Sequence, residues 1–394
     1  MLRTSFGRCI LVLILWLAGL GAAAQFAKFA VPFSDVRLMY PSAGAEIGWL
    51  LTLISAVGAV LGMTAGVFVA RIGLGRTMVM ALFLGGSISL WQATLPGLAL
   101  MLASRVVEGI SHLMIVVAAP TLIAQVTSDR YRGVGMTLWS TFFGVSFALM
   151  AWFGLPSVDH WGLDGLLMGH GAYMLLMAVV LAIALSIADS TEAKATVRLD
   201  QTPMIKRHID AYRSPYVAAP AIGWLFYTMT FVALLAVLPE LLPPSSRTMI
   251  VGFMPIVSIA VSLIIVSVLL VKMTAVTITI TGFILSGIVV MLFFIGLPLP
   301  YICIGLFATL GLIQGASFAS VPELNTTGEA RALANGAMAQ MGNLGNLVGT
   351  PILLAVMGYG GHIAMLLTVV VLYLLGVLAH LLLAHTRSRN AVRT

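Results

Sequence analysis

Charged residues are scarce in this sequence of 394 residues, because Asp, Glu, Lys and Arg together make up only 8% of it. Soluble domains contain about 25% charged and about 45–50% apolar residues, whereas hydrophobic residues here reach 60%. A soluble core cannot bury so much apolar surface, since a globule still needs a polar exterior. The 20 basic residues, set against 13 acidic ones, are too few to form a nucleic-acid-binding face. The composition therefore indicates a protein that lies within a lipid bilayer and binds no nucleic acid.

Cysteine and catalytic motifs are nearly absent. The two cysteines, Cys9 and Cys303, lie within apolar runs, which excludes a disulfide framework and a thiolate metal site. No Gly-x-x-x-x-Gly-Lys-Ser/Thr run is present to bind ATP phosphates. His160 and His170, which we place in or near an outer loop, have no acidic partners at the spacing of metal ligands. We therefore expect no enzyme activity, no metal and no cofactor.

Long apolar runs account for most of the chain. A helix needs about 20 apolar residues to cross roughly 30 Å of hydrocarbon. Uniformly apolar runs predict helices rather than the alternating strands of a barrel. The first run is expected to be retained, although residues 22–25 (Ala-Ala-Ala-Gln) resemble a signal-peptide cleavage site. Twelve such runs begin near Cys9, Ile47, Thr77, Leu98, Gly133, Gly165, Tyr216, Met249, Thr274, Pro300, Leu333 and His362.

One polar stretch divides the runs into two groups of six. We expect an N-terminal six-helix bundle over residues 1–188, a cytoplasmic linker over residues 189–214 and a C-terminal six-helix bundle over residues 215–394. The fold class is thus an all-α polytopic membrane protein with twelve transmembrane helices.

The basic residues predict the orientation, because cytoplasmic loops are enriched in Lys and Arg. With both termini in the cytoplasm, only Arg37 and Arg247 fall on the outer side, while Lys28 and Arg105 lie within crossings. The cytoplasmic side then holds Arg3, Arg8, Arg71, Arg76, Arg130, Arg132, Lys194, Arg198, Lys206, Arg207, Arg213, Lys272, Arg331, Arg387, Arg389 and Arg393. We expect a multi-pass protein of a bacterial-type inner membrane.

The two halves share internal features. Residues 107–111 (Val-Glu-Gly-Ile-Ser) of the fourth run resemble residues 313–317 (Ile-Gln-Gly-Ala-Ser) of the tenth, and each stretch leads to a Pro-x-Leu exit and a polar loop with Arg. Two six-helix halves with matching features are typical of transporters built by duplication. Chance similarity between apolar helices is the alternative.

The sequence as a whole resembles the major facilitator superfamily. Its signature between helices 2 and 3 is G-x-x-x-D-[RK]-x-G-x-[RK]-[RK], and residues 66–76 match it at Gly66, Arg71, Gly73 and Arg76. The resemblance implies that this loop is a cytoplasmic gating loop, although Ala70 replaces the acid whose ion pair latches the halves in the family. A second signature, R-x-x-Q-G, is similar to residues 105–109, with Glu in place of Gln.

Other stretches bear on the branch of the superfamily. Residues 105–120 and 335–346 resemble the cyanate- and nitroimidazole-type transporters. The Gly-Pro signature of drug–proton antiporters is missing from residues 133–156, which disfavours that branch.

Four ionisable residues lie within crossings, where each costs a few kcal/mol and is a functional hypothesis by default. Arg105, Glu108 and His112 share one stripe of the fourth helix, which predicts that they face a cavity or a partner helix. Glu108 would stay ionised while paired with Arg105 and would bind a proton on losing that pair; His112 titrates near neutrality. The alternative is a fixed structural pair and a merely hydrogen-bonded His112. Lys28, three residues after Gln25, is predicted either to hold an anion or to extend toward the headgroups.

Uncharged polar residues and aromatics extend the candidate site. Gln340 and Asn343 of the eleventh helix, and Gln314 as the counterpart of Glu108, could bind a polar solute, or they could join packed helices. Trp139 and Tyr227 could line a pocket or serve as packing residues.

We predict a secondary transporter that moves a small polar or anionic solute by alternating access around a central cavity between the two bundles, coupled to protons. The expected partners are a small-molecule solute, protons and the lipid bilayer, and we expect a monomer. The alternative of the same fold is a drug or toxic-metabolite antiporter that exports its substrate in exchange for protons. A membrane sensor on a transporter scaffold is a further alternative.

Overall fold

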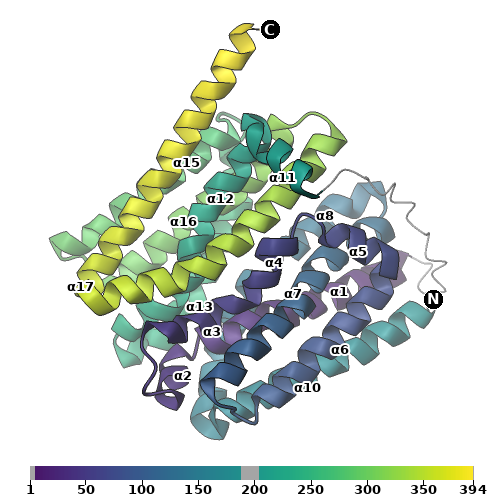
Figure 1. Cartoon of the computed structure of the whole chain (residues 1–394), viewed down its shortest axis with the longest axis vertical. Helices are drawn as coiled ribbons and strands as arrows, with labels where there is room; N and C mark the ends of the chain where they lie inside the picture. Colours follow the sequence, from purple (N-terminus) through teal and green to yellow (C-terminus); the bar gives the residue numbers. More distant parts are fainter. Residues whose placement is uncertain (1–4, 188–203, 394) are drawn as a thin grey trace. The chain divides into compact units, whose positions relative to one another are not determined.

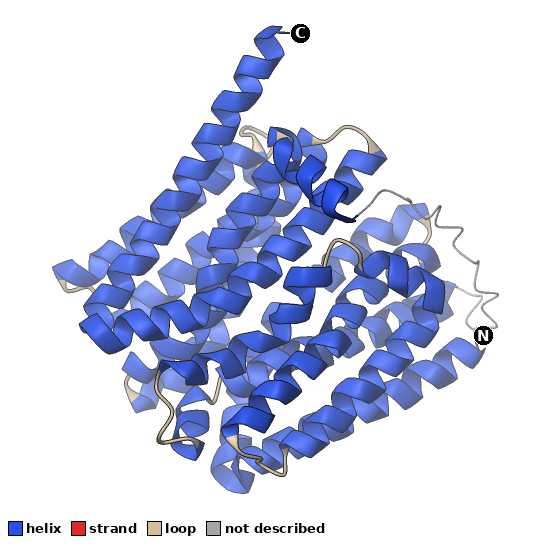
Figure 2. Cartoon of the chain, viewed as in Figure 1, coloured by secondary structure: helices blue, strands red, loops and turns tan. Residues whose placement is uncertain are grey.

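A computed structural model describes residues 5–187 and 204–393, and these residues are mostly helical, joined by turns and loops, with no strand among them (Figure 2). Short 3₁₀ or π-helical turns join several of the helices. The helices are α1 (Ser5–Ala30), α2 (Phe33–Met39), α3 (Trp49–Thr52), α4 (Ala56–Leu61), α5 (Ala65–Ile72), α6 (Leu74–Gln92), α7 (Leu98–Val126), α8 (Asp129–Ser140), α9 (Phe142–Leu149), α10 (Leu155–Ile187), α11 (Met204–Arg213), α12 (Pro215–Val237), α13 (Pro244–Ala260), α14 (Val266–Leu269), α15 (Ala275–Met291), α16 (Leu299–Leu324) and α17 (Gly328–Arg393).

The described residues contain nine helices that are long and apolar enough to cross a membrane. Two of these, Phe142–Ile187 and Ala330–Arg389, each break at a glycine with positive φ, 71° at Gly162 and 67° at Gly361. Figure 1 shows α17 turning back at such a break. If each broken helix is two crossings and the shorter apolar helix Ala45–Leu61 is one more, the described residues accommodate the predicted twelve.

Large apolar side chains remain exposed along the helices, as a lipid-facing surface requires. Phe83 of α6 is 62% exposed, and α10 and α17 each carry a row of exposed large apolar side chains. These exposed positions include Leu176, Val179 and Ile183 on α10, and Leu367, Val371, Leu374 and Leu378 on α17. The apolar surface and the helices together fit the predicted polytopic membrane fold.

The chain forms two compact units. The first comprises Met1–Pro41 and Thr64–Asp200, and the second comprises Ser42–Met63 and Gln201–Thr394. Residues 42–63 therefore pack with the second unit, whereas the predicted division assigns them to the first bundle. Part of the predicted linker, residues 189–203, lies outside the described residues.

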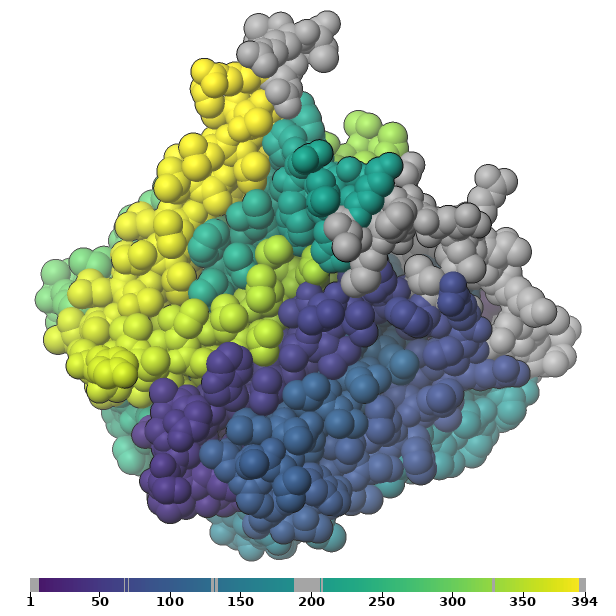
Figure 3. All heavy atoms as spheres, in the orientation of Figure 1, coloured from purple at the N-terminus to yellow at the C-terminus, as the bar shows by residue number. Residues whose placement is uncertain are grey.

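Glycine explains why residues 42–63 pack so closely on α17 (Figure 3). A Cβ at Gly58 would overlap the Asn343 amide, and one at Gly62 would lie 3.3 Å from the Gln340 backbone. At the other end, a Cβ at Gly48 would lie 2.9 Å from Leu354. Small residues four apart permit such close helix packing in membranes. The sequence shows a single apolar run here and does not reveal this packing. In the structure, short irregular turns divide the run into α3, α4 and α5.

Candidate functional site

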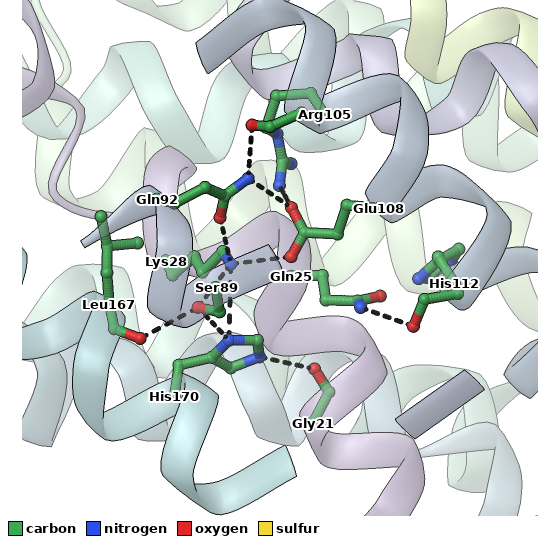
Figure 4. Close-up of polar contacts among 12 residues, drawn as sticks. Gly21, Gln25, Lys28, Ser89, Gln92, Arg105, Glu108, His112, Leu167 and His170 are labelled. Atoms are coloured by element: carbon green, nitrogen blue, oxygen red, sulfur yellow. Dashed lines mark hydrogen bonds and ion pairs between the residues drawn. The ribbon is translucent and has the colours of Figure 1, made fainter. Parts of the chain in front are cut away.

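A buried ionic cluster lies within the first unit, where α1, α6, α7 and α10 meet (Figure 4). Lys28 of α1 and Glu108 of α7 are both fully buried, and Lys28 Nζ lies 2.7 Å from Glu108 Oε1. Arg105, one turn before Glu108, is also fully buried and pairs with Glu108 Oε2. The three residues therefore face protein and not acyl chains, and Lys28 does not extend to the headgroups.

The side chain of Gln92 on α6 makes hydrogen bonds with both the Lys28 ammonium and the Glu108 carboxylate. Its Oε1 accepts a hydrogen bond from Lys28 Nζ at 2.7 Å, and its Nε2 donates to Glu108 Oε2 at 3.0 Å and to Ser104 Oγ at 2.9 Å. One turn earlier, Ser89 Oγ accepts from Lys28 Nζ at 2.9 Å. The three N–H groups of the ammonium thus each have an acceptor: Glu108, Gln92 and Ser89.

The cluster has an excess of positive charge. Lys28 and Arg105 carry two positive charges against the single carboxylate of Glu108, so the net charge of the three is +1. The ring of Phe29 offsets part of this, since it lies 4.7 Å from the Arg105 guanidinium and 5.6 Å from Lys28 Nζ. A buried net charge is costly, and an anion placed beside it would be stabilised. The electrostatics of the site therefore favour an anionic ligand.

His170 of α10 belongs to this cluster and is 6% exposed. Its Nδ1 lies 3.4 Å from Lys28 Nζ and 2.9 Å from Ser89 Oγ, and its Nε2 lies 3.0 Å from the carbonyl oxygen of Gly21. The prediction that His170 lies in or near an outer loop is wrong, because the loop ends at Gly162 and the residue lies two turns into the following helix. Sequence reasoning also missed Ser89 and Gln92. These two polar residues lie one turn apart at the end of an apolar helix, and that spacing could have indicated them as part of the cluster.

Two further candidates from the sequence lie near the cluster but bond elsewhere. Gln25 Nε2 donates to Ser111 Oγ at 3.0 Å, and His112 Nδ1 bonds the carbonyl oxygen of Ala22 at 3.0 Å. The hydrogen bonds of the described residues therefore bring Arg105 and Glu108 together, as their shared stripe predicts, but do not join His112 to them. Gln25 Oε1 has no hydrogen-bond partner among the described residues.

The close crossing of α6 and α10 brings Ser89 and His170 together. A Cβ at Gly86 would lie 3.0 Å from the Gly171 carbonyl oxygen, and a Cβ at Gly171 would lie 3.0 Å from the Gly86 carbonyl oxygen and 2.8 Å from Leu90. Glycine at both positions lets the two backbones approach.

Gly171→Ala should therefore destabilise the protein. The added methyl group meets the α6 backbone, and overpacking of this kind costs about 1–3 kcal/mol. Thermal melting of the purified protein in detergent measures the loss. Gly169→Ala on the same helix is the matched control, because a Cβ there meets nothing within 4 Å. Equal melting temperatures for the two variants would contradict the close crossing.

The second unit holds a smaller polar group on α12, α13 and α16. Gln314 Oε1 accepts hydrogen bonds from Tyr227 Oη and Ser258 Oγ, each at 3.3 Å. Tyr227 stacks on Trp224 with the ring centroids 4.5 Å apart. Gln314, the counterpart of Glu108 in the sequence repeat, therefore bonds uncharged side chains.

Gln340 binds other protein groups in the second unit. Its Oε1 accepts from Tyr212 Oη at 2.9 Å, and its Nε2 lies 3.0 Å from the Ala59 carbonyl oxygen and 2.8 Å from His208 Nε2. Burial raises the pKa of Tyr212 to about 12, so this phenol keeps its proton across the physiological range. Gln340 therefore connects α4, α11 and α17. Asn343, one turn further along, bonds the Ala339 carbonyl oxygen of its own helix.

The remaining candidates lie apart from the cluster. Trp139 stacks on Phe142 with the ring centroids 4.4 Å apart and fills the space beside Gly19 of α1, which is a packing role.

In the turn after α5, Gly73 has φ 98°, a conformation that favours glycine. The other residues of this predicted gating loop lie in helices, Gly66 and Arg71 in α5 and Arg76 in α6, and all three are exposed. Among the described residues no three His, Cys, Asp or Glu side chains are grouped so that they could hold a metal ion.

Comparison with known protein families decides the class to which these helices belong. A model described as Major Facilitator Superfamily matches residues 11–325, which is most of the chain. The chain belongs to the major facilitator superfamily. A search of curated proteins finds no matching relative. The resemblance read from residues 66–76 and 105–109 is confirmed at the level of the superfamily, and the cyanate-type branch stays a prediction. The protein is a membrane transporter of this superfamily.

Proposed function

We propose that this member of the major facilitator superfamily carries a small anionic or polar solute across the membrane by alternating access, coupled to protons, and that the ionic cluster of the first unit binds the solute. The net positive charge of Lys28, Arg105 and Glu108, all fully buried, is the observation that supports the proposal most directly. A transporter that bound only apolar cations would gain nothing from two buried cations, which repel such a substrate.

Proton coupling is supported by the groups that share the cluster. Proton-coupled transport requires a group whose protonation differs between the two access states, and buried ionisable residues are typical of proton pathways in membrane proteins. Glu108 and His170 are both ionisable, and both contact Lys28. A proton and an anion binding to the same few side chains would be coupled through their charges.

A ligand screen followed by transport tests this function. Purified protein is first heated with small anions, neutral metabolites and apolar cations, because a ligand at 100 times its Kd stabilises the native state by about 2.7 kcal/mol. We expect the largest rise in melting temperature with a small anion. Protein reconstituted into vesicles should then accumulate that anion under an imposed pH gradient, and a protonophore should abolish the accumulation. Accumulation driven by a sodium gradient at equal pH would contradict the proton coupling, and stabilisation by apolar cations alone would contradict the substrate class.

A further inference from the structure

The contacts of His170 determine which of its ring nitrogens carries a proton in the neutral ring. A carbonyl oxygen only accepts hydrogen bonds, so the 3.0 Å contact with Gly21 requires that Nε2 carries the proton. The other ring nitrogen, Nδ1, faces the ammonium of Lys28 at 3.4 Å. The three N–H groups of this ammonium already bond Glu108, Gln92 and Ser89, so Nδ1 faces a neighbouring positive charge. A ring lone pair suits that neighbour better than a second N–H would, and the contacts of His170 therefore favour the neutral Nε2–H tautomer.

Ser89 can bond either form of this histidine. Its Oγ lies 2.9 Å from the Leu167 carbonyl oxygen and 2.9 Å from His170 Nδ1, and it accepts from Lys28. The hydroxyl hydrogen can point to Nδ1 of a neutral ring. If Nδ1 gains a proton, Nδ1–H can donate to Ser89 Oγ while the hydroxyl donates to Leu167. The hydrogen bonds thus permit both states.

Charge, in contrast, opposes the protonated ring. The charged groups that surround His170 are Lys28 from α1 and Arg105 and Glu108 from α7, whereas α6 contributes only the neutral Ser89 and Gln92 (Figure 4). Glu108 accepts hydrogen bonds from Lys28, Arg105 and Gln92, so both of its carboxylate oxygens already serve as acceptors. Protonating His170 would raise the net charge of the cluster from +1 to +2 in a dry interior.

We propose that His170 accepts the coupling proton, at Nδ1, when a small monovalent anion binds beside Lys28. This inference rests on the proposed function and names the group that performs its coupling. A hydronium ion transfers one proton to the Nδ1 lone pair, so one N–H bond forms, one O–H bond of the hydronium ion breaks, and a water molecule is left. The anion lowers the net charge from +2 back to +1, so each ligand makes the other easier to bind. By reciprocity the two effects are equal in size.

Nitrogen-15 NMR of protein labelled in its histidine rings tests this directly, with potassium nitrate as the anion probe. Near pH 7, we expect His170 to be the neutral Nε2–H tautomer without nitrate and to carry a proton on both nitrogens with it. Potassium gluconate at equal ionic strength is the control, because this bulky anion should not enter the cluster. His170→Gln assigns the resonance, and single substitutions of the six other histidines assign it by elimination if that variant does not fold.

Proton uptake gives a second readout. In weakly buffered solution with a pH indicator, the protein should take up about one proton for each nitrate bound. His170→Gln should take up none, whereas His160→Gln, an exposed position before the break at Gly162, should behave as the parent protein. A charged His170 without nitrate, or a neutral His170 with and without nitrate, would overturn the inference. If vesicles still accumulate an anion under a pH gradient in that case, the proposed function survives and another group carries the proton.

Discussion

Glu108→Gln should lower the stability of the protein more than any other single change in the cluster. It removes the one carboxylate that separates two fully buried cations, so Lys28 and Arg105 face each other without compensation. Breaking a buried ion pair by removing one partner costs about 3–5 kcal/mol. A large fall in melting temperature, and complete loss of accumulation driven by a pH gradient, are the expected results.

A second substitution separates the charge effect from a general packing defect. Lys28→Met in the Glu108→Gln background removes one of the two cations, so the double variant should melt at a higher temperature than Glu108→Gln alone. Such partial rescue is the sign of direct coupling between the two positions. If the two losses of stability simply add, Lys28 and Glu108 do not interact as the 2.7 Å contact indicates.

Lys28→Met alone should abolish anion transport while leaving the protein folded. The remaining pair, Arg105 with Glu108, is neutral, and the aliphatic stem of Met fills most of the space of the Lys side chain. Without the ammonium, an entering anion has lost a charge-assisted hydrogen-bond donor, which is the strongest kind. We expect the melting temperature to stay close to that of the parent and the thermal shift caused by the screened anion to disappear.

The same variant decides between the proposed function and drug export. A drug–proton antiporter that binds apolar substrates has no need of Lys28 for its substrate, so export would continue in Lys28→Met. Lys28→Arg is the matched variant, because it keeps the charge but has a planar head in place of a compact one. Undiminished anion transport in Lys28→Met would remove the basis for an anion carrier.

The sequence predicts the architecture well because lipid imposes a simple rule. About 20 apolar residues make a crossing, and the turns at Gly162 and Gly361 fall where the apolar runs were divided, near Gly165 and His362. The structure groups residues 42–63 with the second unit, where they pack on α17. Hydropathy carries no information about which helices touch.

The candidate site was predicted in part, for a similar reason. Arg105 and Glu108 are one turn apart on one helix, so helical spacing alone predicts their contact. The partners of Lys28 come from residues 61 to 142 positions away along the chain, and no local pattern reveals them. Gln340 differs from these residues, because its side chain was expected to bind a solute. Its amide instead makes hydrogen bonds with the Tyr212 hydroxyl and the Ala59 carbonyl oxygen.

An experimental structure of the protein with the anion that stabilises it most would show whether the solute binds at the cluster around Lys28. We expect the anion within about 3 Å of Lys28 Nζ, with the contacts of Lys28 to Ser89 and His170 replaced or lengthened. An anion bound elsewhere, with the hydrogen bonds of Lys28 to Ser89, Gln92 and Glu108 unchanged, would contradict this expectation.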